Sequence, residues 1–276
     1  MANDHQPRSR LESVNGLRLH YLEWGEVPSP PMVLLHAAPL NAHAWDDFAK
    51  AMAPHFRVIC PDARGFGDSE WAESSDSTMV DDLKALSEKL GLSGFILIGN
   101  SMGGSIAIRY AAEHPDDVAR LVLVDTGPGP RPVAGAPPPR PPAPPPVPAG
   151  PFASPEEAAL GLPPVFGPKW TAFMTAHNLR QNANGAWAWK FDVQRITGGF
   201  QRSAMDPRRW PLWEAVQCPT LVLRGERSLA MSQASAEEMI KANPKASLVT
   251  VPGAAHFIAI EQPEAFERII REWLGV

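Results

Sequence analysis

An apolar run that ends in a Gly-x-Ser-x-Gly motif constrains this chain more than any other stretch. Residues 95–104 read Phe-Ile-Leu-Ile-Gly-Asn-Ser-Met-Gly-Gly, and a helical pattern follows at once. This order predicts a strand, a sharp turn and a helix, with the Ser101 hydroxyl lifted clear of the sheet. Gly99 and Gly103 would let strand and helix approach closely. The motif favours Ser101 as a nucleophile; the simpler alternative is a serine that caps an ordinary helix.

Apolar runs alternate with helical periodicity on both sides of this motif. Residues 11–24 predict an edge hairpin that turns at Asn15-Gly16. Further strands are expected at 31–36, 57–61, 120–125, 220–224 and 247–251, and helices near 43–52, 77–90, 234–242 and 263–273. The strand runs are almost continuously apolar, so we expect a mostly parallel sheet with helices on both faces.

The alternation breaks in the middle of the chain. Residues 128–151 hold a dense proline tract, which excludes a helix or a central strand and is interpreted as a spacer. Residues 155–213 read as short helices rich in aromatic residues. We therefore expect a core domain of residues 1–127 and 214–276, interrupted by an inserted segment, 128–213, that comprises the proline tract and a helical lid.

Composition narrows the range of partners and compartments. The chain has 276 residues, a size that suits one large α/β domain with an insertion. Its net charge of −5 leaves no basic stripe, so no nucleic-acid partner is expected. The polar first ten residues lack a signal-peptide core, and no later apolar run is long enough to span a membrane. We expect a cytoplasmic monomer or homodimer, with Cys60 and Cys218 as reduced thiols.

Several predicted strand ends carry residues suited to acyl chemistry. In a parallel sheet, ligands bind beyond the carboxyl ends of the strands. Ester hydrolysis needs a nucleophile, a base, a carboxylate that orients the base, and donors for the oxyanion. The strand ends supply His36-Ala37-Ala38-Pro39, Ser101, Asp125 and His256.

These motifs resemble those of the α/β-hydrolases, in which the chain order is nucleophile, acid, histidine. Residues 99–103 match the nucleophile elbow, and Val-Pro-Gly-Ala-Ala-His-Phe at 251–257 resembles the loop that bears the catalytic histidine. Residues 36–39 resemble the oxyanion loop, with Ala37 where glycine is common, and residues 61–69 match another typical segment. The resemblance implies an α/β-hydrolase fold with a mostly parallel central sheet, helices on both faces and a helical lid.

The resemblance also implies roles for individual residues. Ser101 would be the nucleophile and His256 the general base, while the backbone N–H groups of Ala38 and Met102 would hold the oxyanion. The lid aromatics would either line an apolar substrate pocket or form the lid's own small core. Candidates for substrate contact are His43, Trp170, Phe173, Trp187 and Phe257.

The orienting carboxylate departs from the usual pattern of this family. The acid usually follows the strand after the lid, but Ser228 and Leu229 stand there. Glu226 is nearby, although it sits close to the strand end. Some α/β-hydrolases take the acid from the strand after the nucleophile helix instead, where this chain has Asp125. Asp125 is therefore preferred; Glu226 and a dyad without a carboxylate remain alternatives.

The leading functional hypothesis is a serine hydrolase that cleaves carboxylic esters or related small apolar acyl substrates. Gly-Asn-Ser-Met-Gly-Gly also resembles hydrolases that cleave C–C bonds of ring-fission products. A cofactor-independent oxygenase with a His/Asp pair, and a ligand-binding protein with vestigial catalysis, are further alternatives. No cofactor or metal is expected, because the histidines do not cluster at ligand spacing and no phosphate-binding loop is present.

Overall fold

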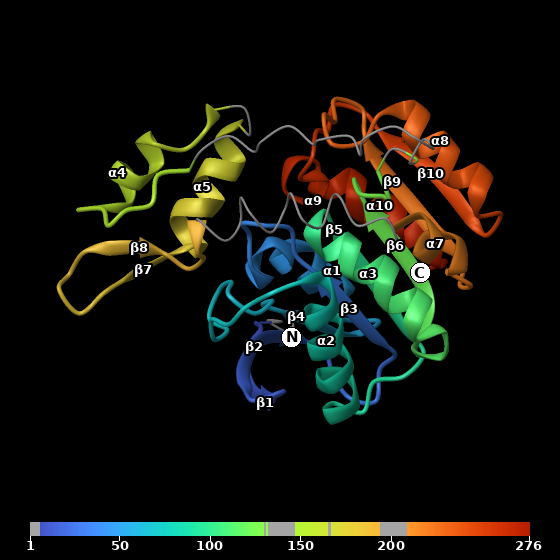
Figure 1. Cartoon of the computed structure of the whole chain (residues 1–276), viewed down its shortest axis with the longest axis horizontal. Coiled ribbons are helices and arrows are strands. Elements are labelled where there is room, and N and C mark those ends of the chain that lie inside the picture. Colours follow the sequence, from blue (N-terminus) through green and yellow to red (C-terminus); the bar gives the residue numbers. More distant parts are fainter. Residues whose placement is uncertain (1–5, 130, 132–146, 165–166, 194–208) are drawn as a thin grey trace.

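An eight-stranded sheet forms the centre of the protein (Figure 1). The computed structural model describes residues 6–129, 131, 147–164, 167–193 and 209–276. The strands are β1 (Arg8–Val14), β2 (Leu17–Trp24), β3 (Pro31–Leu35), β4 (Arg57–Pro61), β5 (Phe95–Asn100), β6 (Val118–Val124), β9 (Thr220–Gly225) and β10 (Ala246–Val251). They lie in the order β1-β2-β4-β3-β5-β6-β9-β10. The strands from β4 to β10 pair in parallel, as predicted.

The first two strands form the expected hairpin at one edge of this sheet. They pair antiparallel, and β2 pairs antiparallel with β4. The turn residues Asn15 and Gly16 have φ values of 51° and 78°, a left-handed backbone that Asn and Gly adopt most readily. The Asn-Gly pair in the sequence therefore predicted this turn correctly.

Helices cover both faces of the sheet. They are α1 (Asp46–Met52), α2 (Asp76–Lys89), α3 (Met102–Glu113), α7 (Arg209–Ala215), α8 (Gln233–Ala242), α9 (Ile258–Glu261) and α10 (Pro263–Leu274), with short 3-10 helices η1 (Ala42–Trp45) and η2 (Pro115–Asp117). Buried side chains of α1 and α10 share one core with the sheet, and those of α2, α3, α7 and α8 share the other. The helix predicted over 43–52 is thus split, because Asn41 caps a 3-10 turn ahead of α1.

The inserted segment differs in part from the helical lid that we predicted. Its described residues, 147–164 and 167–193, are called the cap segment below. They form α4 (Pro155–Leu160), α5 (Gly167–His177), β7 (Leu179–Gln181) and β8 (Trp187–Trp189). The expectation of helix throughout is wrong at β7 and β8, which pair antiparallel. The chain forms a hairpin here because the Asn182 side chain accepts from the Asn184 and Ala186 N–H groups and so stabilises the turn between the two strands.

The cap segment lies to one side of the core, next to the N-terminal half of the sheet (Figure 1). The predicted boundary at residue 213 falls within α7, which packs on the core, since Trp213 Nε1 donates to Met239 O at 3.0 Å. Most of the proline tract at 128–151 lies outside the described residues, so its role as a spacer stays a prediction. The division into domains likewise stays a prediction.

Candidate active site

Ser101 occupies a strained turn between β5 and α3. Its φ and ψ are 51° and −111°, a conformation that costs a non-glycine residue about 1–3 kcal/mol. The close approach of strand and helix holds it there. A methyl group at Gly99 would collide with the Gly103 carbonyl, and one at Gly103 would collide with the Leu35 carbonyl. The two glycines are therefore required by the packing around the serine.

The residue before the serine joins the parts of the site. Asn100 Nδ2 donates to Val124 O at 2.7 Å and to His256 O at 3.2 Å. The Thr126 hydroxyl donates to Ser101 O at 3.1 Å. The ends of β5 and β6 and the loop that carries His256 are therefore tied together around Ser101.

Asp125 and His256 form a hydrogen-bonded pair, in which the imidazole is partly exposed and the carboxylate is buried. Asp125 Oδ2 lies 2.8 Å from His256 Nδ1, and the Asp125 side chain is fully buried. The same oxygen accepts from Ser228 Oγ at 2.6 Å, and Oδ1 accepts from the Gly225 N–H at 3.0 Å. These donors compensate for burying the carboxylate. With Nδ1–H donating to Asp125, the Nε2 atom of His256 is left as an acceptor.

The structure separates the two candidate acids. Glu226 is exposed, and its Oε2 accepts from the Gly253 N–H at 2.8 Å, away from the imidazole partner of Asp125. Ser228 has a role that sequence reasoning missed. Its hydroxyl donates to Asp125, and it also accepts from the Met231 N–H at 3.1 Å. Its position, where relatives of this kind usually carry the acid, was the available signal.

The loop after β3 is held by His36. Burial lowers the pKa of His36, although Asp62 and the Ala37 carbonyl oppose this effect. His36 Nδ1 donates to Ala37 O at 3.0 Å, and Nε2 accepts from the Ala63 N–H at 3.0 Å. The loop so fixed contains Ala38. The other proposed oxyanion donor, Met102, is the first residue of α3, and its N–H has no acceptor within the helix.

Asp62 organises the segment at 61–69. Its Oδ1 accepts from the Ala42 N–H at 2.7 Å, and its Oδ2 accepts from the Asp68 N–H at 2.8 Å and contacts His20 Nδ1 at 2.7 Å. Burial acts to raise the pKa of Asp62, but these hydrogen bonds and the nearby histidines outweigh it and lower the pKa. A side chain at Gly67 would collide with this carboxylate. The segment is therefore structural and anchors the start of η1.

Helix α5 brings aromatic side chains to the His256 loop. The Phe257 ring lies 5.0 Å from the His256 ring and 6.1 Å from the Trp170 ring, between ring centroids. Trp170 is only 1% exposed. One turn along the same helix face, Phe173 packs 5.1 Å from the His177 ring. Trp170 and Phe257 thus form a buried contact between the cap segment and the core.

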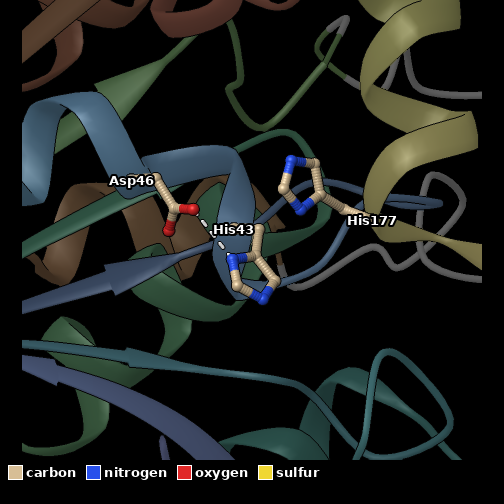
Figure 2. Close-up of side chains that lie close together, drawn as sticks. All are labelled: His43, Asp46 and His177. Carbon is tan, nitrogen blue, oxygen red and sulfur yellow. Dashed lines mark hydrogen bonds and ion pairs between the residues drawn. The ribbon is translucent and has the colours of Figure 1, made fainter. Parts of the chain in front are cut away.

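The two remaining candidates for substrate contact, His43 and Trp187, lie in different parts of the structure. The His43 ring stacks on the His177 ring at 4.7 Å, and its Nδ1 bonds to Asp46 Oδ2 at 2.8 Å, as Figure 2 shows. The hydrogen bond to Asp46 raises the pKa of His43. Trp187 belongs to the cap hairpin, where its N–H and C=O both pair with Phe152 at 2.8 Å. The cluster of His43, Asp46 and His177 could not be found from sequence spacing, because His177 comes from a segment far from the other two.

A largely apolar pocket lies beside the start of α3. It has a volume of about 420 Å³, including the space open to solvent. Its lining comes from the end of β3, from α2 and from α3, and includes Leu35, His36, Leu83, Met102 and Ile106. The pocket therefore reaches Met102 and is lined there mainly by apolar side chains.

Comparison with known proteins places the chain in a family. It matches the alpha/beta hydrolase fold over residues 30–263. It is 29% identical to the mouse sn-1-specific diacylglycerol lipase ABHD11 over 262 residues, which cover 91% of this chain and 83% of that protein. It is 30% identical to a 3-hydroxybutyrate-oligomer hydrolase of Cupriavidus necator over 260 residues, 87% of each chain.

A solved structure agrees with the fold. E-2-(Acetamidomethylene)succinate hydrolase superposes with a TM-score of 0.81 at 20% identity, covering 98% of this chain and 100% of the other. Over the described part of the chain, no helix is both long and apolar enough to cross a bilayer. The matches confirm the resemblance drawn from the sequence motifs. The protein is thus an enzyme of the α/β-hydrolase family.

Proposed function

We propose that the protein hydrolyses carboxylic esters or related acyl compounds. Ser101 is the nucleophile, His256 the general base and Asp125 the acid that orients it. The observation that carries this proposal is the 2.8 Å bond between the buried Asp125 Oδ2 and His256 Nδ1, beside the strained turn at Ser101. An ionised carboxylate on Nδ1 leaves Nε2 free to accept a proton.

The reaction proceeds through an acyl-enzyme. Ser101 Oγ attacks the ester carbonyl carbon while its proton passes to His256 Nε2. The N–H groups of Ala38 and Met102 bind the oxyanion, and each such donor contributes about 3 kcal/mol to stabilising the transition state. His256 then gives the proton to the departing alcohol. A water molecule, deprotonated by His256, then attacks the acyl carbonyl carbon; the bond to Ser101 Oγ breaks, and His256 returns the proton to Ser101 Oγ as the acid leaves.

The relatives and the pocket support an ester substrate with a small apolar acyl group. Diacylglycerols and 3-hydroxybutyrate oligomers, which appear in the names of two relatives, both contain ester bonds. The pocket beside Met102 offers apolar walls from Leu35, Leu83 and Ile106. An acyl chain whose carbonyl sits at the Met102 N–H could extend into this space.

Labelling with a fluorophosphonate probe tests the nucleophile. We expect one adduct per chain, located on the peptide that contains Ser101 and absent from the Ser101→Ala variant. Hydrolysis of p-nitrophenyl butyrate should be lost in the same variant. A well-folded protein that the probe does not label would contradict the proposal. Turnover of a vinylogous diketone in place of the ester would indicate C–C hydrolysis, and oxygen consumption that survives Ser101→Ala would indicate an oxygenase.

A further inference from the structure

Three side chains with metal-binding atoms meet where the cap segment touches the core. His43 and Asp46 lie at the junction of η1 and α1, and His177 lies at the end of α5. One ligand atom from each falls within 4.8 Å of the others. His43 and Asp46 are three residues apart in a helical stretch, so they share a face. Figure 2 shows His177 reaching across to them from the opposite side.

The donors suit a borderline transition metal. Imidazole nitrogen with carboxylate oxygen is a ligand set that Zn²⁺ accepts, whereas Mg²⁺ and Ca²⁺ prefer oxygen alone. Asp46 has coordination capacity to spare, because its Oδ1 is buried without a hydrogen-bond partner among the described residues. The His43 and Asp46 side chains are 29% and 32% exposed, which leaves an entry path for an ion.

A second group of possible ligands lacks this spare capacity. His20, Asp62 and Asp68 also cluster. Both Asp62 oxygens already accept from backbone N–H groups, and Asp68 pairs with Lys190 at 2.9 Å. An ion there would compete with the His20 contact to Asp62 and with the Asp68–Lys190 ion pair, whereas Asp46 keeps one oxygen without a hydrogen-bond partner among the described residues. Of the two groups, the cluster of His43, Asp46 and His177 is therefore the better candidate for an ion-binding site.

We propose that His43, Asp46 and His177 bind one zinc-class divalent ion that joins the cap segment to the core. In a tetrahedral site with Zn–N distances near 2.1 Å, neighbouring ligand atoms are roughly 3.4 Å apart. The ligand atoms, which now lie within 4.8 Å of one another, would have to draw closer to reach this separation. The set supplies three ligands, so water or a substrate group completes the coordination.

The ion would reinforce a contact that leads directly to the proposed oxyanion loop. Asn41 Nδ2 donates to His177 O at 2.9 Å and to Asn178 Oδ1 at 2.7 Å. Asn178 Nδ2 in turn donates to Pro39 O at 3.1 Å, one residue from Ala38. An ion that holds His177 against His43 therefore resists separation of α5 from this loop. If substrate enters by such a separation, the ion inhibits turnover, a consequence that rests on the proposed function.

Zinc titration of the tag-free, chelator-treated protein tests the site. Calorimetry should show one Zn²⁺ per chain, and Co²⁺ should give the visible absorption of a low-symmetry His/carboxylate site. His177→Ala and Asp46→Asn should each weaken Zn²⁺ binding at least tenfold, while His55→Ala, an exposed histidine outside the cluster, should leave it unchanged. Circular dichroism checks that each variant is folded.

The outcomes separate the site from the proposed catalysis. Equal Zn²⁺ affinity in the parent, His177→Ala and Asp46→Asn proteins would overturn the site, as would an absence of binding to the parent at 100-fold molar excess. Zn²⁺ binding that depends on His177, in a protein without esterase activity, would support the site and refute the proposed function. Where esterase activity is present, Zn²⁺ should lower it in the parent, EDTA should restore it, and His177→Ala should shift the inhibition to higher Zn²⁺ concentration.

Discussion

The substitution Asp125→Asn gives the sharpest test of the proposed mechanism. The amide has the same shape as the carboxylate, so the packing at this fully buried position is preserved. Its oxygen can still accept from the Gly225 N–H, which places the NH₂ group where Oδ2 meets Ser228 and His256. An NH₂ group there donates to His256 Nδ1, and the imidazole proton then resides on Nε2.

This tautomer cannot accept a proton from Ser101, so the variant should lose most of its catalytic rate. In serine proteases, the corresponding change lowers kcat by about 10⁴, equivalent to about 5 kcal/mol of transition-state free energy. We expect a loss of similar size in the hydrolysis of p-nitrophenyl esters, with KM nearly unchanged. The thermal unfolding midpoint should also fall, because the Ser228 hydroxyl loses its acceptor while its own oxygen already accepts from the Ala230 and Met231 N–H groups.

Two matched variants test whether the loss of activity is specific to the Asp125 carboxylate. Glu226→Gln changes the other candidate acid, whose partner is the Gly253 N–H, and should keep kcat within about a factor of three. Ser228→Ala removes a hydrogen bond to the buried carboxylate, which contributes about 1.5–3 kcal/mol to stability. It keeps the correct tautomer, so kcat should fall far less than in Asp125→Asn. A folded Asp125→Asn protein with more than a tenth of the parental kcat would refute the assignment.

Three further changes probe the elements around the site. Gly103→Ala pushes a methyl group into the Leu35 carbonyl and should destabilise the protein by about 1–3 kcal/mol in urea titration; an unchanged midpoint would show that the elbow can relax. Trp170→Ala leaves a cavity beside Phe257, where the Trp170 side chain is only 1% exposed, and should lower the unfolding free energy by about 3–5 kcal/mol and raise KM. A loss of stability below about 1 kcal/mol would mean that the contact between cap segment and core contributes little. Because the pKa of Asp62 is lowered in the folded protein, the unfolded chain binds a proton at this residue first as pH falls, and the unfolding free energy should decline below about pH 4. Urea titrations should show that Asp62→Asn flattens this decline. An equally steep decline in the parent and the variant would contradict the prediction.

The core of the fold could be predicted because its signals are local. The runs at the parallel strands are mostly apolar, and the longer helices carry the helical period, so β4, predicted at 57–61, was found at those residues. The strained turn at Ser101 followed from two glycines at fixed spacing. The cap hairpin could not be found in the same way, because its strands are three residues each and depend on an Asn side chain that closes the turn.

The candidate site was predictable only in part, because its contacts join distant segments. Asp125 and His256 could be placed at the same edge of the sheet, because parallel strands present their carboxyl ends on one side. That Ser228 donates to Asp125 depends on the course of the loop after β9, which leaves no periodic signal. The meeting of His43 and His177 depends on how the cap segment docks, and no pattern within either segment encodes that.

The place of Asp125 at the end of β6 makes the proposed chemistry independent of the length of the insert. The proposed nucleophile, acid and oxyanion donors all precede residue 128, and the chain re-enters the sheet where Leu121 on β6 pairs with Thr220 on β9. The parallel pairing of β9 with β10 then returns the chain to the loop that bears the proposed base. We therefore expect that a cap from another member of the family can be grafted between β6 and β9 without moving the proposed reacting groups, provided that it offers an amide to Asn41. Substrate selectivity and the proposed machinery would then be separately exchangeable parts.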